Sequence, residues 1–134
     1  MGLVHHQLCF GCGQTNLFGL QMEVEPADER GVTGRLFVKQ DHGGRPGLAH
    51  PGLVATALEE VMSLALEAEG VSADLESLVL RIVSALPLGT FLTLGARIEG
   101  VEDGRAAVEA WAELRGAESR TVACATASFV EARG

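Results

Sequence analysis

The sequence holds 134 residues, which is enough for one domain with an apolar core of its own. Its formal net charge of −8 argues against binding to nucleic acid, because such binding depends on clustered Lys and Arg that neutralise phosphates. Hydrophobic residues make up 47% of the chain, yet the apolar runs are much shorter than the roughly 20 residues that cross a bilayer, so we expect no membrane segment.

The first third of the chain predicts two strands and a loop. In residues 20–24 apolar and polar side chains alternate, as they do in a half-buried strand. Residues 26–29 have the composition of a turn, and residues 32–39 predict a second strand. Residues 41–47 are rich in Gly and Pro, which predicts an irregular loop that leads into the next element.

One long helix is predicted from residue 52 to residue 69. Beyond Gly52 this segment has neither Pro nor Gly until Gly70, a residue type that often follows the end of a helix. At about 100° per residue, its polar side chains gather on one arc. They are Thr56, Glu59, Glu60, Ser63 and Glu67. The apolar face is wider than usual, so we expect the helix to lie in a curved sheet and to contact a second surface as well.

The remainder of the chain predicts strands only. Asp103-Gly104 is a typical hairpin turn, and links of this length join antiparallel neighbours. The predicted strands are residues 75–85, 91–101, 105–115 and 120–131, joined by short links at 87–89, 102–104 and 116–118. The fold class is therefore α+β, with one helix packed on one antiparallel sheet in a single domain, residues 1–134.

Four short motifs carry a resemblance to a known family. They are Cys9-Phe10-Gly11-Cys12-Gly13 with Gly19-Leu20, Pro46-Gly47-Leu48-Ala49-His50-Pro51-Gly52, Leu58-Glu59-Glu60, and Pro87-Leu88-Gly89. In these motifs the sequence resembles the hotdog-fold acyl-CoA thioesterases, particularly the phenylacetate-pathway type and the thioesterase-superfamily relatives of mammals. The likeness covers nearly the whole chain. It implies a hotdog fold, in which the helix packs in a curved antiparallel sheet.

The resemblance also implies an activity and the residues that carry it. Family members have an Asp or Glu nine positions after a histidine at the start of the helix, which here are Glu59 and His50. That carboxylate acts as nucleophile or general base on a thioester, while a backbone N–H at the start of the helix polarises the carbonyl. The substrate would be an acyl-CoA or another small thioester, with coenzyme A as part of the substrate and no further cofactor. The pocket usually lies between two subunits, which implies a homodimer or homotetramer.

Glu59 and Glu60 are distinguished by their places on the helix. Glu59 lies at the border of the apolar face, where partial desolvation raises the pKa of a carboxyl and suits base chemistry. Glu60 lies at the opposite border and is the weaker candidate. We expect Glu60 and Glu67 to be solvated or to face a partner subunit.

The start of the helix departs from the family pattern at two positions. The residue after His50 is usually a glycine whose N–H contributes to the oxyanion hole, but Pro51 has no N–H. Gly52 is the alternative amide donor. The Asn or Gln that often stands six residues before the histidine is replaced by Gly44. A second hypothesis is therefore a hotdog protein that binds an acyl or aromatic ligand without turning it over.

The residues expected to serve the substrate fall into two groups. Glu59, His50 and Gly52 form the catalytic group, and His50 acts as support. The substrate-binding group is Gly44, Arg45, Pro51, Glu60 and Met62.

The N-terminal segment, residues 1–19, is rich in Cys and Gly and holds a weaker candidate for a metal site. Cys9 and Cys12 have the Cys-x-x-Cys spacing that zinc accepts, with His5 and His6 nearby. A second Cys pair is lacking, so a full site would need one of the histidines and a ligand from elsewhere in the fold. The alternative is a tight Gly-rich turn without metal, and our expectation is that no metal is bound.

Two further features of the sequence predict where the protein resides. Three cysteines are not a disulfide framework. No basic segment followed by an apolar run opens the sequence, so we expect no secretory signal and a cytoplasmic location.

Overall fold

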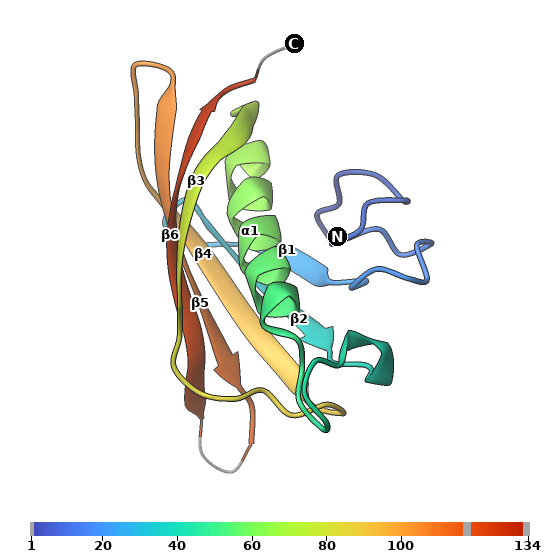
Figure 1. The fold of residues 1–134 in the computed structure, drawn as a ribbon. Helices are drawn as coiled ribbons and strands as arrows, with labels where there is room; N and C mark the ends of the chain where they lie inside the picture. The colour runs from blue at the N-terminus through green and yellow to red at the C-terminus, as the bar shows by residue number, and fades with distance from the viewer. Residues whose placement is uncertain (1, 117–118, 133–134) are drawn as a thin grey trace.

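One helix lies across one face of a six-stranded antiparallel sheet (Figure 1). A computed structural model of the chain describes residues 2–116 and 119–132. The strands lie in the order β1-β2-β4-β5-β6-β3. The elements are β1 Glu23–Ala27, β2 Gly31–Phe37, the 3₁₀ turn η1 Gln40–His42, α1 Pro51–Ala68, β3 Ala73–Ile82, β4 Phe91–Glu102, β5 Arg105–Leu114 and β6 Arg120–Glu131. The predicted fold class is confirmed.

The ends of α1 follow local sequence rules. Pro51 occupies the first turn, where its fixed φ and missing N–H carry no penalty. At the other end Gly70 has φ +76, a conformation that favours glycine. The N–H of Gly70 donates to the carbonyl of Glu67, and the N–H of Val71 donates to the carbonyl of Leu66, which together form a Schellman motif. The predicted end of the helix is confirmed.

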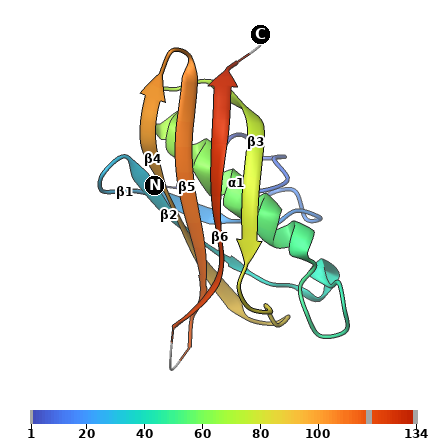
Figure 2. The same ribbon diagram turned by 60° about the vertical axis from the view of Figure 1, so that its left-hand side comes forward.

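The hairpin between β4 and β5 turns at Asp103-Gly104, as predicted. Both residues have positive φ, 51° and 74°, as a two-residue turn matched to the strand twist requires. Strand β3 departs from the simple meander, because it comes before β4 in the chain but pairs with β6 (Figure 2). β1 and β3 are thus the two edges of the sheet.

Three of the sequence predictions need correction or fall outside the described residues. The first strand runs over Glu23–Ala27 and not over residues 20–24, since the N–H groups of Leu20 and Met22 donate to carbonyls of the N-terminal segment, those of Phe10 and Gly11. Within the predicted loop 41–47 a short 3₁₀ turn forms at Gln40–His42. The predicted link 116–118 includes residues 117 and 118, which lie outside the described residues.

Helix α1 has two covered faces. One face packs on the sheet, and its side chains include Leu58, Val61 and Met62, which are fully buried. The N-terminal segment lies on the side of α1 away from the sheet, as Figure 1 shows in blue. The segment bonds to Glu60, Ser63 and Glu67, which belong to the polar arc of α1, so these contacts do not test the second surface expected for the apolar face. No helix within the described residues is long and apolar enough to span a membrane.

Candidate functional site

Glu59 is a half-buried carboxylate in the middle of α1. It forms no hydrogen bond or ion pair with any other residue that the structure describes. Burial, and then the neighbouring charge of Glu60, raises the pKa of Glu59 above its ordinary value, while His5 acts in the opposite direction. Helix geometry thus gives Glu59 the two properties expected of a reactive carboxylate, partial desolvation and free oxygens.

Glu60 is not solvated, contrary to the prediction. Only 5% of the residue is exposed, because the N-terminal segment covers it. Its Oε2 lies 2.8 Å from Nδ1 of His5 and 3.3 Å from Sγ of Cys9. Burial acts to raise the pKa of Glu60, but the hydrogen bonds from His5 and Cys12 outweigh it and hold the pKa below its ordinary value. Glu60 therefore faces its own chain and not a substrate.

The imidazole of His5 connects the N-terminal segment to three residues of the helix. Its Nδ1 faces Glu60, and its Nε2 lies 3.0 Å from Oγ of Ser63 and 3.1 Å from Oε2 of Glu67. Hydrogen bonds with Cys12 and Glu60 raise the pKa of His5 to about 11, against the effect of burial. Glu67 is partly exposed to solvent, as predicted, but its Oε2 also contacts Nε2 of His5.

Cys9 and Cys12 belong to a tight turn that packs against Glu60. The N–H of Gly13 donates to the carbonyl of Cys9 at 2.9 Å, which closes the turn. A Cβ on Gly11 would lie 2.4 Å from the carboxyl carbon of Glu60, so a side chain at this position would displace the carboxylate. Burial raises the pKa of the Cys12 thiol, although the hydrogen bond with His5 opposes it.

Four residues therefore meet at one point. One ligand atom from each of His5, Cys9, Cys12 and Glu60 lies within 4.8 Å of the others. Of the two adjacent histidines, His6 stays outside, exposed, and accepts a hydrogen bond from the N–H of Leu8. The sequence indicated three of these residues. Glu60 was missed as their partner, and its only sequence signal was its place on the polar arc of α1.

The amides at the start of α1 are already engaged. The N–H of Gly52 donates to Nδ1 of His50 at 2.8 Å, so His50 caps the helix. The N–H of Leu53 donates to the carbonyl of His50 at 2.9 Å. Pro51 has no backbone N–H that could donate. While the cap is in place, Gly52 is not a free donor for an oxyanion.

The loop before the helix explains why residue 44 is glycine. A Cβ at Gly44 would come within 2.9 Å of the Cα of His50, so a side chain there would displace the helix start. Arg45, next to it, is exposed and forms no ion pair with a described residue. Met62 lies in the core with 0% exposure, where it packs the helix on the sheet and cannot contact a ligand at the surface.

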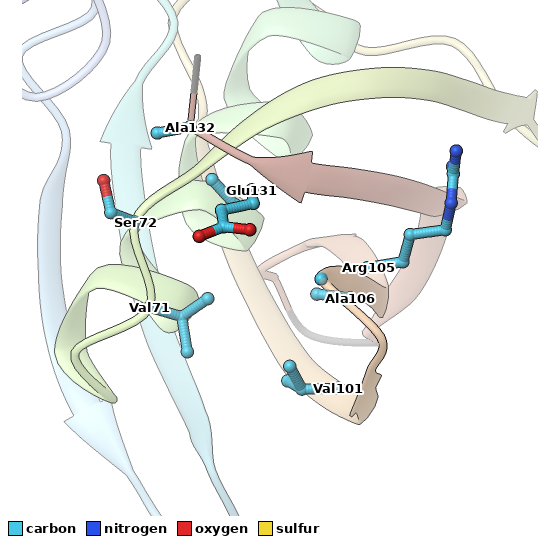
Figure 3. Close-up of a pocket in the computed structure, with 9 residues that line it drawn as sticks. Val71, Ser72, Val101, Arg105, Ala106, Glu131 and Ala132 are labelled. Atoms are coloured by element: carbon cyan, nitrogen blue, oxygen red, sulfur yellow. The ribbon is translucent and has the colours of Figure 1, made fainter. Parts of the chain in front are cut away.

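A hollow of about 410 Å³ lies beyond the C-terminal end of α1 (Figure 3). It is lined by Val71, Ser72, Ala73, Val101, Gly104, Arg105, Ala106, Glu131 and Ala132. None of the predicted site residues belongs to it. Within the single chain, Glu59 and this hollow thus lie in different places.

Solved structures with the same architecture include proteins named as thioesterase superfamily members. The PaaI protein from the phenylacetic acid degradation operon of E. coli matches with a TM-score of 0.77 over 86% of this chain and 82% of that chain, at 15% identity. The chain has the hotdog fold. The hotdog fold that the sequence motifs implied is therefore confirmed.

Two further hotdog structures extend the comparison. A hypothetical thioesterase from Streptococcus pneumoniae TIGR4, solved with coenzyme A, matches with a TM-score of 0.75 over 81% of this chain and 84% of that chain, at 18% identity. A thioesterase superfamily protein matches with a TM-score of 0.73 and 23% identity over 82% of this chain, which spans 53% of that chain. No protein-family model and no curated protein matches the sequence.

Proposed function

We propose that the protein hydrolyses an acyl-CoA thioester and that Glu59 is its reactive carboxylate. The observation that carries the proposal is the state of Glu59, half-buried and without a partner among the described residues, in a hotdog fold. The similar structure solved with coenzyme A supports a thioester of this class as the substrate. Glu60 is excluded from this role because His5 and Cys9 already bond to its carboxylate.

Two routes are open to a carboxylate in this position. As a nucleophile, Glu59 attacks the thioester carbonyl, the C–S bond breaks and coenzyme A leaves as a thiolate, after which water hydrolyses the anhydride. As a general base, Glu59 takes a proton from the attacking water and returns it to the leaving sulfur. A carboxyl whose pKa is raised is suited to the second route, because it is the stronger proton acceptor.

Arg45 is the residue we assign to the coenzyme A phosphates. It lies in the loop before α1, is exposed, and has no acidic partner among the described residues. An unpaired guanidinium binds phosphate oxygens through several donors at once. Arg45 would thus provide a local positive charge for the phosphates, although the net charge of the chain is −8.

The test is hydrolysis of a panel of acyl-CoA thioesters by the wild type and by Glu59→Gln. Loss of a base or nucleophile is expected to lower kcat by about 100-fold or more, since general base catalysis typically contributes a factor of that size. Glu69→Gln is the matched control, because Glu69 is an exposed carboxylate at the far end of the same helix. It should leave kcat unchanged.

Two results would contradict the proposal. One is a wild type that cleaves no thioester of the panel above background. The other is a Glu59→Gln variant that retains full activity while its circular dichroism and melting temperature match the wild type.

The second candidate is a protein that binds the ligand without cleaving it. The hydrogen bonds at the helix start favour it, because Pro51 offers no N–H and that of Gly52 is taken by His50. In that case a non-hydrolysable acyl-CoA analogue raises the melting temperature while the thioester panel stays intact. The same panel thus separates the two candidates.

We further propose that the substrate pocket forms between two copies of the chain. Strand β3 is an edge of the sheet, and apolar side chains on it and just after it are exposed, among them Val79 at 68% and Val83 at 57%. Exposed edge strands of this kind pair readily with a second chain. The absence of Glu59 from the hollow in Figure 3 fits a pocket that one copy cannot complete.

A further inference from the structure

We propose that His5, Cys9, Cys12 and Glu60 bind one zinc ion that fastens the N-terminal segment to α1. The four ligand atoms come from two parts of the chain, since His5, Cys9 and Cys12 precede Glu60 by 48 to 55 positions. One side is the turn at Cys9 and Cys12, and the other is the middle of the helix. The site is separate from the thioester chemistry, and it stands or falls independently of it.

The distances fit a tetrahedral ion. Zinc bonds of about 2.0–2.3 Å place neighbouring ligand atoms about 3.3–3.8 Å apart. Nδ1 of His5 lies 3.6 Å from Sγ of Cys9 and 3.5 Å from Sγ of Cys12, and Sγ of Cys9 lies 3.3 Å from Oε2 of Glu60. Among these four distances, the 2.8 Å between His5 and Glu60 must widen by about half an ångström to admit the ion, and all four ligand atoms lie within 4.8 Å of one another.

The surroundings of His5 are those of a metal ligand. In zinc sites the second ring nitrogen of a ligating histidine usually donates to a carboxylate or another acceptor, which fixes the orientation of the ring. Here Nε2 of His5 lies 3.1 Å from Glu67 and 3.0 Å from Ser63. When the ring is neutral and Nε2 is the donor, the lone pair of Nδ1 faces the two sulfurs and Glu60.

The sulfur of Cys12 is also positioned by a hydrogen bond. The backbone N–H of His5 donates to Sγ of Cys12 at 3.1 Å, an interaction that favours a thiolate. Cys12 is 1% exposed and Glu60 is 5% exposed, so solvent hardly reaches these ligands. A buried carboxylate needs a compensating cation, and zinc supplies two positive charges where the imidazolium of His5 would supply one.

The ligand set selects the ion and its role. Two thiolates with an imidazole favour zinc over magnesium or calcium, which bind oxygen ligands. Four protein ligands leave no open position for water or substrate, so the ion is structural. It fixes the segment that covers the helix beside Glu59. The missing Cβ of Gly11 lets the turn reach Glu60 and thereby brings the two sulfurs to the carboxylate.

The test is the metal content of tag-free protein purified in the presence of zinc. The expected result is about one zinc per chain, lost in His5→Ala and in Cys9→Ser with Cys12→Ser. The matched controls are His6→Ala, which changes the adjacent exposed histidine, and Cys124→Ser, which changes the exposed cysteine of β6. Both controls should retain the metal.

Cobalt gives a second measurement that does not depend on whether the variants fold. Reduced wild type stripped by a chelator and titrated with Co²⁺ should show thiolate charge-transfer bands and the intense visible bands of tetrahedral cobalt. Removing zinc should also lower the melting temperature, because binding energy of a structural ion is folding energy. Zinc-free protein that also fails to bind cobalt overturns the proposal. So does a folded His5→Ala variant that keeps its zinc.

Discussion

Two neighbouring carboxylates on α1 have pKa values shifted in opposite directions, because only one of them has hydrogen-bond partners among the described residues. Glu59 and Glu60 differ by one position in the chain, and both are removed from bulk water. Glu60 is bonded to His5 and Cys9, so its charge is compensated and its pKa is lowered. Glu59 has no such partner among the described residues, so the burial that both share raises its pKa. The difference in chemistry comes from the N-terminal segment and not from the helix.

A third buried ionisable side chain, His42, predicts how stability depends on pH. Burial, and then the charge of Lys39, lowers the pKa of His42 below its ordinary 6.5, while a bond with the backbone of Gly19 and the charge of Asp41 oppose this. The unfolded chain therefore takes up the proton first as the pH falls. Stability from His42 is complete above about 6.5 and is lost as the pH falls through the lowered pKa.

The variant His42→Asn isolates this contribution. Asn keeps an acceptor for the N–H of Lys39, which now donates to Nδ1 of His42 at 3.0 Å, but it does not titrate. Urea unfolding at pH 8 and pH 5 should show a smaller loss of stability in the variant than in the wild type. Equal losses in the two proteins would show that His42 titrates normally in the folded state.

The two ends of helix α1 are determined by residues at those ends. His50 caps the start and Gly70 ends the last turn, and both positions follow from the residues themselves. The cap has a further effect at this scale, since the side chain that stabilises the helix also occupies the amide of Gly52. The N–H of Gly52 can therefore either stabilise the helix start through His50 or donate to an oxyanion, but not both at once.

Removing the cap should therefore destabilise the protein measurably. His50→Ala leaves the N–H of Gly52 without its partner, and loss of a helix cap typically lowers the free energy of unfolding by about 0.5–2 kcal/mol. His50→Asn is the control, because asparagine is among the best capping residues. Chemical denaturation measures both variants. A fall in stability of the same size in His50→Asn would refute the capping role.

At the scale of the whole molecule, the sheet leaves β3 as an unprotected edge. Its exposed apolar side chains fit a surface that a second copy covers. Lysine on an edge strand is a common means of preventing such pairing. The double change Val79→Lys with Val83→Lys should shift sedimentation from dimer to monomer while circular dichroism is retained.

The control for this experiment lies elsewhere on the surface. Val101→Lys changes an exposed valine of β4, an interior strand of the sheet, and should leave the assembly unchanged. A wild type that sediments as a monomer at micromolar concentration would contradict the proposed pairing.

The features that the sequence predicted correctly depend on residues close to one another in the chain. The hairpin at Asp103-Gly104 and the end of α1 at Gly70 depend on φ values that few residue types adopt, so composition alone identifies them. The hotdog architecture was reached through motifs around His50 and Glu59 and was confirmed by structures of low identity.

What the sequence did not predict depended on contacts between distant residues. Glu60 and His5 are 55 positions apart, and nothing in either segment states which face of α1 the N-terminal segment covers. For the same reason the sequence placed Met62 at a substrate, although it is in the core. The shift of the first strand to Glu23 likewise reflects hydrogen bonds from residues 20–22 to the N-terminal segment.

The place of β3 in the sheet also imposes an order on folding. Because β3 pairs with β6, its sheet partner emerges from a ribosome only after β4 and β5 have been synthesised. During that interval the apolar side chains of β3 lack the neighbour that will shield part of them. Such long-range pairing closes late and slowly. The nascent chain therefore passes through a stage in which this strand is open to a chaperone or to misassociation.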